Sequence, residues 1–402
     1  MKKPLSTLLV GVGGYGNLYS TFLLGGESSS DFNLVGAVDP FAKNAPRYED
    51  LKATVPIFND MADFFVEHST DLTIIATPIH LHYEQCMTAF ENGSHVMCEK
   101  PLVPTPEELD RLDAAAEGKH FAVGFNWCSS DIILSLKERI LAGEFGRPLR
   151  LKSYISWPRG WGYYSRGIKW AGKIKTEDGK LIYDSIASNA TSHFIQNMLF
   201  LLGASVEESA PISNVDVECY RANDIETFDT IAFKGSAAGA EIFFLASHAA
   251  CHRTDPIMDF EFEKARIHLN IENQKFSCTF YLKDGDEEKI VEDELNFKVG
   301  PLISIAKRIR GEEAYICTTG TVRPFTVFIN EVFEKVPFRV FPENLITVDP
   351  TFKATYPLNQ IDGAVYVKDL HLDLRNCYDQ TKLPSEEALP WASEATRILS
   401  TD

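Results

Sequence analysis

The sequence predicts an α/β protein of two domains, and two patterns along the chain predict it. Over residues 1–127, short apolar runs alternate with segments of helical periodicity, the pattern of a doubly wound parallel sheet built from βαβ units. Over residues 128–402, runs rich in β-branched and aromatic residues alternate apolar with polar positions, which is typical of antiparallel strands. We therefore expect a parallel-sheet domain followed by an α+β domain with a large, mostly antiparallel open sheet and helices on one face.

The first domain is expected to be built from five strands with helices between them. The strands are predicted at Leu8–Val12, Leu34–Asp39, Leu72–Ala76, His95–Cys98 and Phe121–Gly124, and helices at Asp60–His68, Leu81–Asn92 and Thr105–Glu117. The last of these helices has Thr105 as its capping residue, Pro106 in the first position and two glutamates in the first turn, which together predict a helix start.

The second domain is expected to begin with a helix at Asp131–Ala142 and to consist mainly of strands after it. The strands are predicted at Arg150–Ser156, Asp216–Tyr220, Thr227–Phe233, Ala240–Ser247, Asp259–Phe262, Arg266–Ile271 and Lys275–Leu282, with helices at Ile186–Leu202, near Pro324–Lys335 and near Gln360–Tyr378. The sequence Lys283-Asp284-Gly285-Asp286 is a turn that can join two strands in a hairpin.

Composition and charge argue against several classes of protein. The 402 residues are 45% hydrophobic and carry a formal net charge of -18, so there is apolar material for two cores and little affinity for nucleic acid or an anionic membrane surface. The eight cysteines form no CxxC pair, which is typical of reduced side chains in a cytoplasmic protein. No apolar run approaches the length of a membrane span, and the basic start leads into the first strand without the cleavage site of a secretion signal.

A glycine-rich turn joins the first predicted strand to the helix after it. Gly11, Gly13 and Gly16 have the G-x-G-x-x-G spacing, in which the first glycine permits a tight turn, the second lets a pyrophosphate approach the backbone and the third lets the helix pack on the strand. The second strand ends at Asp39, 23 residues beyond Gly16, close to the usual spacing for a carboxylate that binds a ribose 2′-hydroxyl. Because no adjacent arginine follows to bind a 2′-phosphate, the pattern favours NAD over NADP. A purely structural turn is the alternative.

Two further motifs end neighbouring strands of the predicted sheet. Thr77-Pro78 follows the third strand, with His80 and His82 shortly after it, and Glu99-Lys100-Pro101 follows the fourth. Because the carboxyl ends of parallel strands meet at one edge of a sheet, both motifs are expected beside the glycine turn. A lysine in that place suits proton transfer next to a nucleotide. A plain turn and a surface lysine are the alternatives.

An aromatic and basic segment extends over Trp157–Lys173. It contains three of the five tryptophans, interleaved with arginines and lysines. Aromatic faces with fixed hydrogen-bond donors suit a polyhydroxylated ligand, whereas the acidity of the whole chain argues against nucleic acid. A loop packed against a domain interface is the alternative interpretation.

Two groups of polar residues occur later in the chain. Asn189 and His193 are four residues apart in a predicted helix that ends at Gly203, so they are expected on one helical face. His248, Cys251 and His252 are residue types that bind metals, but they lack a fourth ligand at a recognisable spacing. We therefore expect no metal site.

Together these residues resemble the glucose–fructose oxidoreductase, inositol dehydrogenase and rhizopine-catabolism (Gfo/Idh/MocA) family. The resemblance rests on the glycine turn, Thr77-Pro78 with His82, Glu99-Lys100-Pro101, Gly124-Phe125-Asn126 and Asn189-x-x-x-His193, and it extends to about Gly203. It implies an NAD-binding Rossmann domain over residues 1–127 and a substrate-binding and oligomerisation domain over residues 128–402. In relatives the lysine–proline bond is often cis, so a cis bond before Pro101 is expected.

The resemblance also implies roles for residues in both domains. Lys100 and His193 are expected to hold or deprotonate the substrate hydroxyl while a hydride passes to the cofactor, and Asn189 is expected to orient His193 or a substrate hydroxyl. The expected cofactor-binding residues are Gly11, Gly13, Tyr15, Gly16, Asp39, Thr77, Pro78, His82, Glu99, Lys100 and Asn126. The expected substrate-binding residues are Lys100, Tyr164, Arg166, Trp170, Asn189 and His193.

Three positions depart from the family pattern. Asn189 stands where many relatives have aspartate and, unlike aspartate, takes up no proton. Gln196 replaces a second frequent aspartate, and Trp127-Cys128 replaces a frequent arginine. The substrate pocket is therefore expected to differ from that of the best-known inositol dehydrogenases.

The sequence as a whole predicts an NAD-dependent oxidoreductase that transfers a hydride between a nicotinamide cofactor and a secondary alcohol of a sugar, cyclitol or glycoside. An NAD-dependent glycosidase or lyase of the same fold and a non-catalytic NAD-bound sensor are the alternatives. The expected partners are a small polyol or sugar and further copies of the chain in a homodimer or homotetramer. Neither nucleic acid nor a membrane is expected as a partner.

Overall fold

The computed structural model describes residues 3–25, 29–166, 169–272, 275–353 and 361–398. The chain divides into two compact units, each made of two stretches of sequence. The first comprises Met1–Ser130 and Leu295–Arg323, and the second comprises Asp131–Glu294 and Pro324–Asp402. The sequence places residues 295–323 in the second domain, whereas the structure groups them with the first unit.

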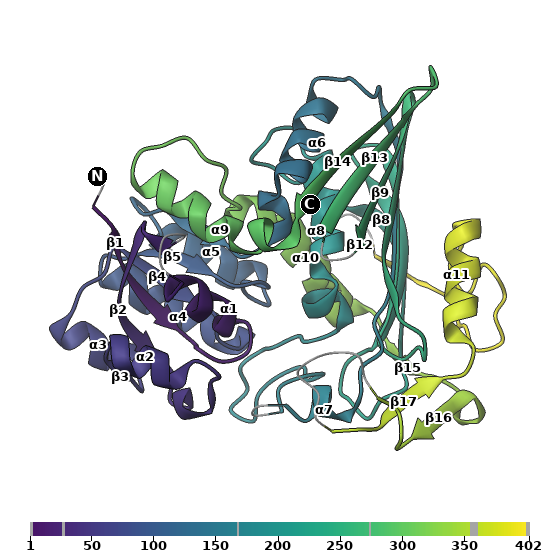
Figure 1. Ribbon diagram of the computed structural model, residues 1–402. Coiled ribbons are helices and arrows are strands. Elements are labelled where there is room, and N and C mark those ends of the chain that lie inside the picture. Colours follow the sequence, from purple (N-terminus) through teal and green to yellow (C-terminus); the bar gives the residue numbers. More distant parts are fainter. Residues whose placement is uncertain (1–2, 26–28, 167–168, 273–274, 354–360, 399–402) are drawn as a thin grey trace. The chain divides into compact units, whose positions relative to one another are not determined.

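The first unit contains the predicted parallel sheet (Figure 1). Its six strands, in the order β3-β2-β1-β4-β5-β6, are β1 (Leu5–Val10), β2 (Phe32–Val38), β3 (Ile57–Phe58), β4 (Leu72–Ile75), β5 (His95–Cys98) and β6 (Phe121–Val123), and all neighbours pair in parallel. The strand order reverses direction between β1 and β4, and sheets of this kind bind ligands at the carboxyl ends of the strands beside such a switch point. Strand β3 has only 2 residues, which are too few to give a recognisable strand pattern in the sequence.

The helices of the first unit connect these strands. They are α1 (Gly16–Leu23), α2 (Tyr48–Thr54), α3 (Met61–Glu67), α4 (Ile79–Glu91) and α5 (Pro106–Ala115), with short 3₁₀ turns η2 (Ala42–Asn44) and η3 (Asn126–Ser129). The predicted start of α5 is confirmed, because the Thr105 side chain accepts a hydrogen bond from the Glu108 N–H and Pro106 is the first helical residue. Helix α3 is capped in the same way by Asp60.

Helix α9 (Glu294–Ile309) explains why a late part of the sequence belongs to the first unit. Leu302, Ile305 and Ile316 are buried in the same apolar cluster as Leu9 and Ile74 of the parallel sheet. Their burial removes apolar surface from water, which stabilises this grouping. The sequence pattern does not predict α9, because Pro301 interrupts the helical periodicity inside the helix.

The second unit contains a ten-stranded sheet with the order β14-β13-β12-β11-β7-β10-β9-β8-β15, in which β18 also pairs with β8. The strands are β7 (Pro148–Ser156), β8 (Ser213–Arg221), β9 (Thr230–Ala237), β10 (Ala240–Ser247), β11 (Thr254–Phe262), β12 (Ala265–Glu272), β13 (Lys275–Leu282), β14 (Glu287–Asp293), β15 (Phe338–Val340) and β18 (Thr396–Ile398). The pairs β7–β10 and β8–β15 are parallel, and the other described pairs are antiparallel. The predicted turn joins β13 to β14, an edge strand that the sequence analysis did not predict.

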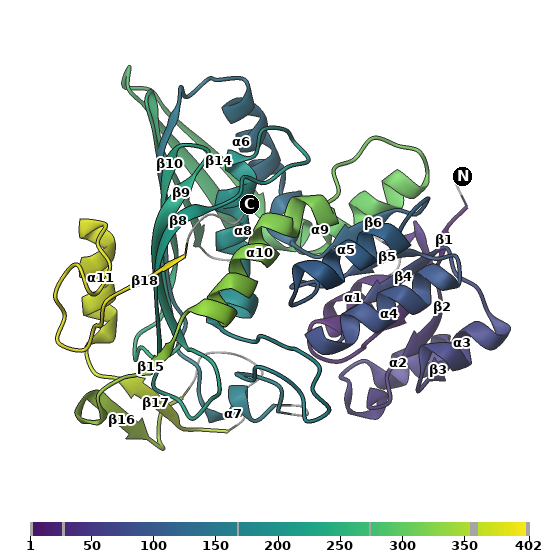
Figure 2. The same cartoon turned by 180° about the vertical axis from the view of Figure 1, so that it is seen from behind.

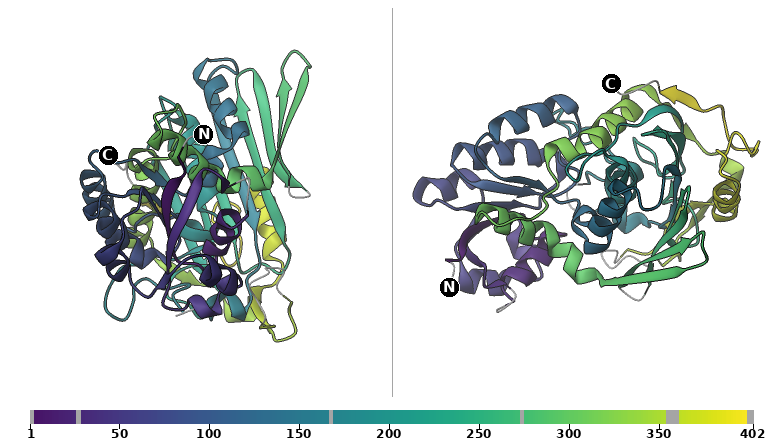
Figure 3. Two further views of the ribbon diagram at one scale, coloured as in Figure 1. Left: turned by 60° about the vertical axis from the view of Figure 1, so that its left-hand side comes forward. Right: turned by 90° about the horizontal axis from the view of Figure 1, so that it is seen from above.

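Helices lie against both faces of this sheet (Figure 2, Figure 3). Helices α6 (Asp131–Leu141) and α8 (Ser192–Leu202) are on one face, and α11 (Leu370–Gln380) is on the other. Leu370, Leu374 and Tyr378 of α11 pack on Tyr154 and Phe243 of the sheet. The expectation of helices on one face is therefore wrong, because this apolar outer surface is covered by the chain that follows it.

The remaining elements complete the second unit. They are the one-turn helix α7 (Trp161–Tyr164), the π-helical turn η4 (Ile186–Ala190), the 3₁₀ turn η5 (Glu343–Leu345), the hairpin strands β16 (Ile346–Asp349) and β17 (Ala364–Val367), and α10 (Thr319–Lys335), which begins in the first unit. The predicted helix near Gln360–Tyr378 is wrong over β17, and Gln360 lies outside the described residues. In the described part of the chain, every helix is too short or too polar to cross a membrane.

Candidate active site

The glycine turn follows β1 and has two closely packed glycines and one open one. A Cβ atom on Gly11, whose φ is +83°, would lie 2.7 Å from the Ala76 carbonyl oxygen, and one on Gly16 would lie 2.0 Å from the Gly11 carbonyl oxygen. A Cβ atom on Gly13 would meet no atom within 4 Å. The first and third glycines are therefore required by the protein's own packing, while the second leaves its backbone accessible to a phosphate group.

Asp39 places a carboxylate beside this turn. It follows β2, and its Oδ2 accepts a hydrogen bond from the Val12 N–H at 3.0 Å, while its Oδ1 accepts one from the Phe41 N–H at 2.8 Å. The two bonds fix the carboxylate at the carboxyl end of β1 and β2. This is the arrangement expected of a group that binds a ribose hydroxyl.

His82 links the segments that follow β4 and β5. Its imidazole is 1% exposed, with Nε2 2.8 Å from the Thr77 carbonyl oxygen and Nδ1 3.0 Å from the Pro101 carbonyl oxygen. Burial lowers the pKa of His82, and the contacts of its ring nitrogens with the carbonyl oxygens oppose that shift. Pro78 forms the N-cap position of α4, and the Thr77 hydroxyl donates to Gln85 Oε1 at 2.5 Å. His82 therefore positions the two segments, and its contact with a cofactor stays a prediction.

The Glu99-Lys100-Pro101 motif follows β5, and the Lys100–Pro101 bond is cis, as expected. Glu99 is buried, and its Oε1 accepts a hydrogen bond from the Tyr19 hydroxyl at 2.5 Å, while Oε2 accepts one from the Lys100 N–H at 3.2 Å. Burial raises the pKa of Glu99 to about 7, which the Tyr19 hydrogen bond and the Lys100 charge oppose. The carboxyl group thus supports the backbone of the partly exposed Lys100 from inside the unit.

The Gly124-Phe125-Asn126 segment passes directly over Glu99. A Cβ atom on Gly124 would lie 2.7 Å from Glu99 Oε1, so only glycine fits without displacement. Asn126 is 5% exposed, and its Nδ2 donates to the Tyr15 hydroxyl at 3.1 Å. These contacts join the residues after β1 to those after β6 across the carboxyl edge of the sheet.

The first unit therefore brings its predicted residues together along one edge of the parallel sheet. Each of them contacts another predicted residue or lies in a turn that follows one of the strands. These residues are Gly11, Gly13, Tyr15, Gly16, Asp39, Thr77, Pro78, His82, Glu99, Lys100 and Asn126. An open glycine backbone, a helix N-terminus and a fixed carboxylate on one edge fit a dinucleotide.

In the second unit, Asn189 and His193 lie in two separate helical segments. The π-helical turn η4 contains Asn189 and is capped by Ser185, whereas His193 is in the first turn of α8. Between them Thr191 has φ -112° and ψ 10°, outside the helical region. The expectation of one continuous helix from Ile186 is wrong here, because η4 has π-helical spacing. The predicted end of the helix at Gly203 is confirmed.

Asn189 is held by a buried carboxylate. Its Nδ2 donates to Asp184 Oδ1 at 2.9 Å, and Asp184 Oδ2 accepts a hydrogen bond from the Gly172 N–H at 2.6 Å. Asp184 is 2% exposed, so these bonds are shielded from water. Asp184 therefore fixes the amide of Asn189 and the end of the aromatic segment at the same time.

The aromatic segment forms a stack of rings and guanidinium groups. The Arg166 guanidinium lies 3.6 Å from the ring centroid of Tyr163 and 4.7 Å from that of Trp170. The Tyr164 hydroxyl oxygen is buried without a hydrogen-bond partner, and burial raises its pKa well above the usual value. Residues 167–168 of this segment lie outside the described residues. The stack presents the residue types expected to contact a sugar, and that contact stays a prediction.

Sequence reasoning missed two residues that hold the candidate site in place. Tyr19 supports Glu99 from 80 positions earlier in the chain, and a tyrosine in an apolar helix gives no signal of such a partner. Asp184 lies five residues before Asn189, so its proximity was visible, but not its burial. Gln196, which replaces a frequent aspartate of the family, is buried, and its Nε2 donates to the Ser209 hydroxyl inside the unit.

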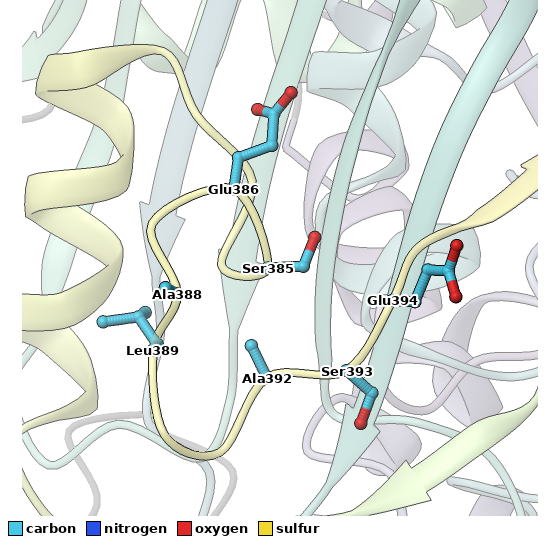
Figure 4. A pocket seen from close by; sticks show the side chains of 7 residues that line it. All are labelled: Ser385, Glu386, Ala388, Leu389, Ala392, Ser393 and Glu394. Carbon is cyan, nitrogen blue, oxygen red and sulfur yellow. The ribbon is translucent and has the colours of Figure 1, made fainter.

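A cavity of about 440 Å³ lies in a different part of the second unit (Figure 4). Its lining residues all follow α11: Ser385, Glu386, Ala388, Leu389, Ala392, Ser393 and Glu394. The predicted catalytic and binding residues are not among them. We therefore keep the cavity apart from the candidate active site.

The fold and the glycine turn define a dinucleotide-binding Rossmann domain, and comparison with known proteins shows which family it resembles. Residues 5–126 match the oxidoreductase family with an NAD-binding Rossmann fold, Gfo/Idh/MocA. The chain is 26% identical to scyllo-inositol 2-dehydrogenase (NADP(+)) IolW of Bacillus subtilis (strain 168) over 56% of this chain and 60% of that one. It is also 26% identical to D-glucoside 3-dehydrogenase of Escherichia coli (strain K12), over 36% of this chain and 41% of that one. The match to the Gfo/Idh/MocA oxidoreductase family thus covers residues 5–126, which belong to the first unit.

A solved structure extends the likeness in fold beyond the first unit. Levoglucosan dehydrogenase, in a complex with NADH, aligns with a TM-score of 0.67 over 83% of this chain and 96% of its own, at 16% sequence identity. At that identity the likeness establishes the fold alone. The sequence matches to the two curated relatives span about half of their length, so the activity of the whole protein is a matter for proposal.

Proposed function

We propose that the protein is an NAD-dependent dehydrogenase that oxidises a secondary alcohol of a sugar, cyclitol or glycoside. The observation that carries the proposal is the sheet edge of the first unit, where the open backbone of Gly13, the carboxylate of Asp39 and the amine-bearing Lys100 follow β1, β2 and β5 of one parallel sheet. The relatives named scyllo-inositol 2-dehydrogenase and D-glucoside 3-dehydrogenase support the substrate class.

Each residue of the site has a separate role in the proposed reaction. Bound NAD would supply the hydride acceptor. Lys100 takes the hydroxyl proton of the substrate as general base, with its backbone N–H held by Glu99. His193 is the proposed second polar group on that hydroxyl, and Asn189, fixed by Asp184, orients the substrate through hydrogen bonds. Tyr164, Arg166 and Trp170 provide the apolar and hydrogen-bonding surface for the sugar ring.

Asp39 supports NAD over NADP. Its carboxylate is fixed beside the glycine turn by the N–H groups of Val12 and Phe41, and a negative charge there repels a 2′-phosphate. The name of one relative specifies NADP. The cofactor preference of this protein therefore has to be measured and is not inferred from its relatives. We expect a higher kcat/KM with NAD than with NADP. A location in the cytoplasm and assembly as a homodimer or homotetramer remain part of the proposal.

The first experiment measures turnover by the full chain with NAD and a panel of polyols, aldoses and glycosides. Nicotinamide reduction and glycosidic cleavage are followed together. Lys100→Ala is expected to lower kcat by about 10²- to 10⁴-fold, the usual contribution of a general base. Lys43→Ala, which changes an exposed lysine of the same unit, is the matched control and should keep the wild-type rate.

A double-mutant cycle tests whether residues of the two units act on one substrate. If Lys100 and His193 hold the same hydroxyl, the combined variant should lose much less kcat/KM than the product of the two single losses. A full rate in Lys100→Ala, or fully independent losses, would refute the assigned roles. Cleavage without net reduction would favour the glycosidase, and NAD binding without turnover would favour the sensor.

A further inference from the structure

Two residues of the β10–β11 connection meet a residue of α11 in the second unit. Cys251 and His252 follow β10, and His371 is in the first turn of α11, 120 positions after Cys251. Cys251 Sγ lies 3.7 Å from His371 Nδ1. One ligand atom from each of the three residues lies within 4.8 Å of the others. The chain has thus brought a thiol and two imidazoles to one point on the side of the sheet that α11 covers.

These separations fit a tetrahedral metal ion. Zinc binds sulfur at ~2.3 Å and imidazole nitrogen at ~2.0–2.1 Å, so tetrahedral angles put a sulfur and a nitrogen ligand about 3.6 Å apart. The distance of 3.7 Å between Cys251 Sγ and His371 Nδ1 is close to that value. His252 is exposed, so its side chain rotates freely enough to complete the set from a separation of 4.8 Å or less.

We propose that Cys251, His252 and His371 bind one Zn²⁺ ion, with water in the fourth position, and that the ion fastens α11 to the sheet. The site is independent of the proposed dehydrogenase reaction. It revises the expectation of no metal site, which was based on spacing along the sequence. His248, weighed there as a ligand, takes no part, because its Nδ1 faces the Trp157 carbonyl oxygen at 2.8 Å and its ring is buried.

Hydrogen bonds from neighbouring side chains hold the backbones of the two proposed histidine ligands. The Ser156 hydroxyl donates to the His252 carbonyl oxygen at 2.7 Å, and the Tyr154 hydroxyl donates to that of His371 at 3.3 Å. Both donors belong to β7, so the two histidine backbones are anchored to the same strand. The rings of His252 and His371 are already in contact, with centroids 4.3 Å apart. Such support outside the ligands is typical of metal sites.

The charge around the group favours a cation. Asp369, the N-cap residue of α11, lies two residues before His371 and adds a carboxylate near the three proposed ligands. As the zinc–sulfur bond forms, the S–H bond breaks and its proton passes to water.

Metal binding is tested on the full chain, free of any affinity tag and stripped with a chelator. Titration with Co²⁺, a coloured substitute for Zn²⁺, should give one ion per chain and a cobalt–thiolate charge-transfer band, which Zn²⁺ then abolishes. Cys251→Ser, His252→Ala and His371→Ala should each weaken binding by at least about 100-fold, more than the loss of a residue outside the ligand set. His68→Gln, at an exposed histidine of the first unit, is the control and should bind as the wild type does.

Three results would overturn the proposal. They are the absence of stoichiometric binding by the wild type, binding without the thiolate band, and unchanged binding in the variants. His252→Ala decides the matter if the other two variants fold poorly, because its side chain is exposed. Zn²⁺ should also slow amide hydrogen exchange in α11 of the wild type and not of His252→Ala, and unchanged exchange would refute the fastening role.

Discussion

Each compact unit buries a glutamate that accepts a hydrogen bond from a tyrosine, and the two pairs serve different ends. In the first unit Tyr19 donates to Glu99, and in the second Tyr220 donates to Glu218 at 2.6 Å. Burial raises the pKa of both carboxyl groups. Glu99 is next to Lys100, whereas Glu218 also accepts from the hydroxyl of Ser385, 167 residues later. The first pair supports a candidate catalytic residue, and the second ties down the C-terminal segment.

Sequence motifs identify the functional residues of the first unit more fully than those of the second, and the two units differ in a way that explains this. In the first unit the functional groups follow strands of a parallel sheet, and topology alone brings those strand ends to one edge. In the second unit the groups lie in loops and helix starts, such as η4 and the β10–β11 connection, and are fixed by side chains distant in sequence. Variants in each unit test this contrast.

The largest effect is expected from Gly16→Ala. The new Cβ atom would lie 2.0 Å from the Gly11 carbonyl oxygen, which belongs to the backbone and cannot rotate away. Overpacking of this kind should lower the free energy of unfolding by about 3 kcal/mol or more. Urea unfolding measures the loss.

Gly13→Ala is the matched control for that variant. No atom beyond the adjacent residues lies within 4 Å of the added Cβ, so stability should stay within about 0.5 kcal/mol of the wild type. NAD affinity should fall by about tenfold or more, because the pyrophosphate is expected to approach this backbone. An equal loss of stability in both variants would contradict the distinction between a glycine needed for packing and a glycine needed for cofactor binding. Unchanged NAD affinity in Gly13→Ala would contradict the proposed role of Gly13.

The next prediction compares the pH dependence of the free energy of unfolding in two variants, Glu99→Gln and Glu218→Gln. With a pKa of about 7, Glu99 keeps its proton in the folded state where the unfolded chain has lost it. Its stabilising contribution is complete below about pH 4.5 and is lost as the pH rises through 7, by up to about 3 kcal/mol. Glu99→Gln should remove that slope in urea unfolding between pH 5 and pH 8.

Glu218→Gln should flatten the pH dependence in the same direction, because burial also raises the pKa of Glu218. The two variants should separate in turnover. Glu99→Gln is expected to move the pH profile of kcat, since Glu99 binds the backbone of Lys100, and Glu218→Gln is expected to leave it in place. A pH profile shifted equally by both would contradict the contrast between the two pairs.

A smaller effect is expected from Asp184→Asn in the second unit. An amide cannot accept from both the Gly172 N–H and Asn189 Nδ2, so one buried donor loses its acceptor and the free energy of unfolding should fall by about 1–3 kcal/mol. The KM for substrate should rise more than the KM for NAD, because Asn189 belongs to the proposed sugar site. Asp224→Asn, at an exposed position, is the control. A larger change in the KM for NAD would place Asn189 with the cofactor.

The candidate cofactor site was largely predictable, and particular residues show why. Gly11, Gly16 and Asp39 act through local backbone geometry at strand ends, and the structure confirms the closely packed turn and the carboxylate beside it. The support of Glu99 by Tyr19 was not predictable, because it joins a helix to a strand end across the sheet. Nor was the position of α9 in the first core, where tertiary burial outweighs the interruption by Pro301.

By itself the sequence determined the parallel sheet, its glycine turn and the motifs along its edge, because strand alternation, glycine spacing and chain order are local properties. Only the tertiary structure decided which distant side chains meet. It placed Asn189 in a π-helical turn apart from the α-helix that carries His193, paired Asp184 with Asn189 and brought His371 to Cys251. Such partners are selected by packing between segments far apart in the chain, and that packing leaves no fixed spacing in the sequence.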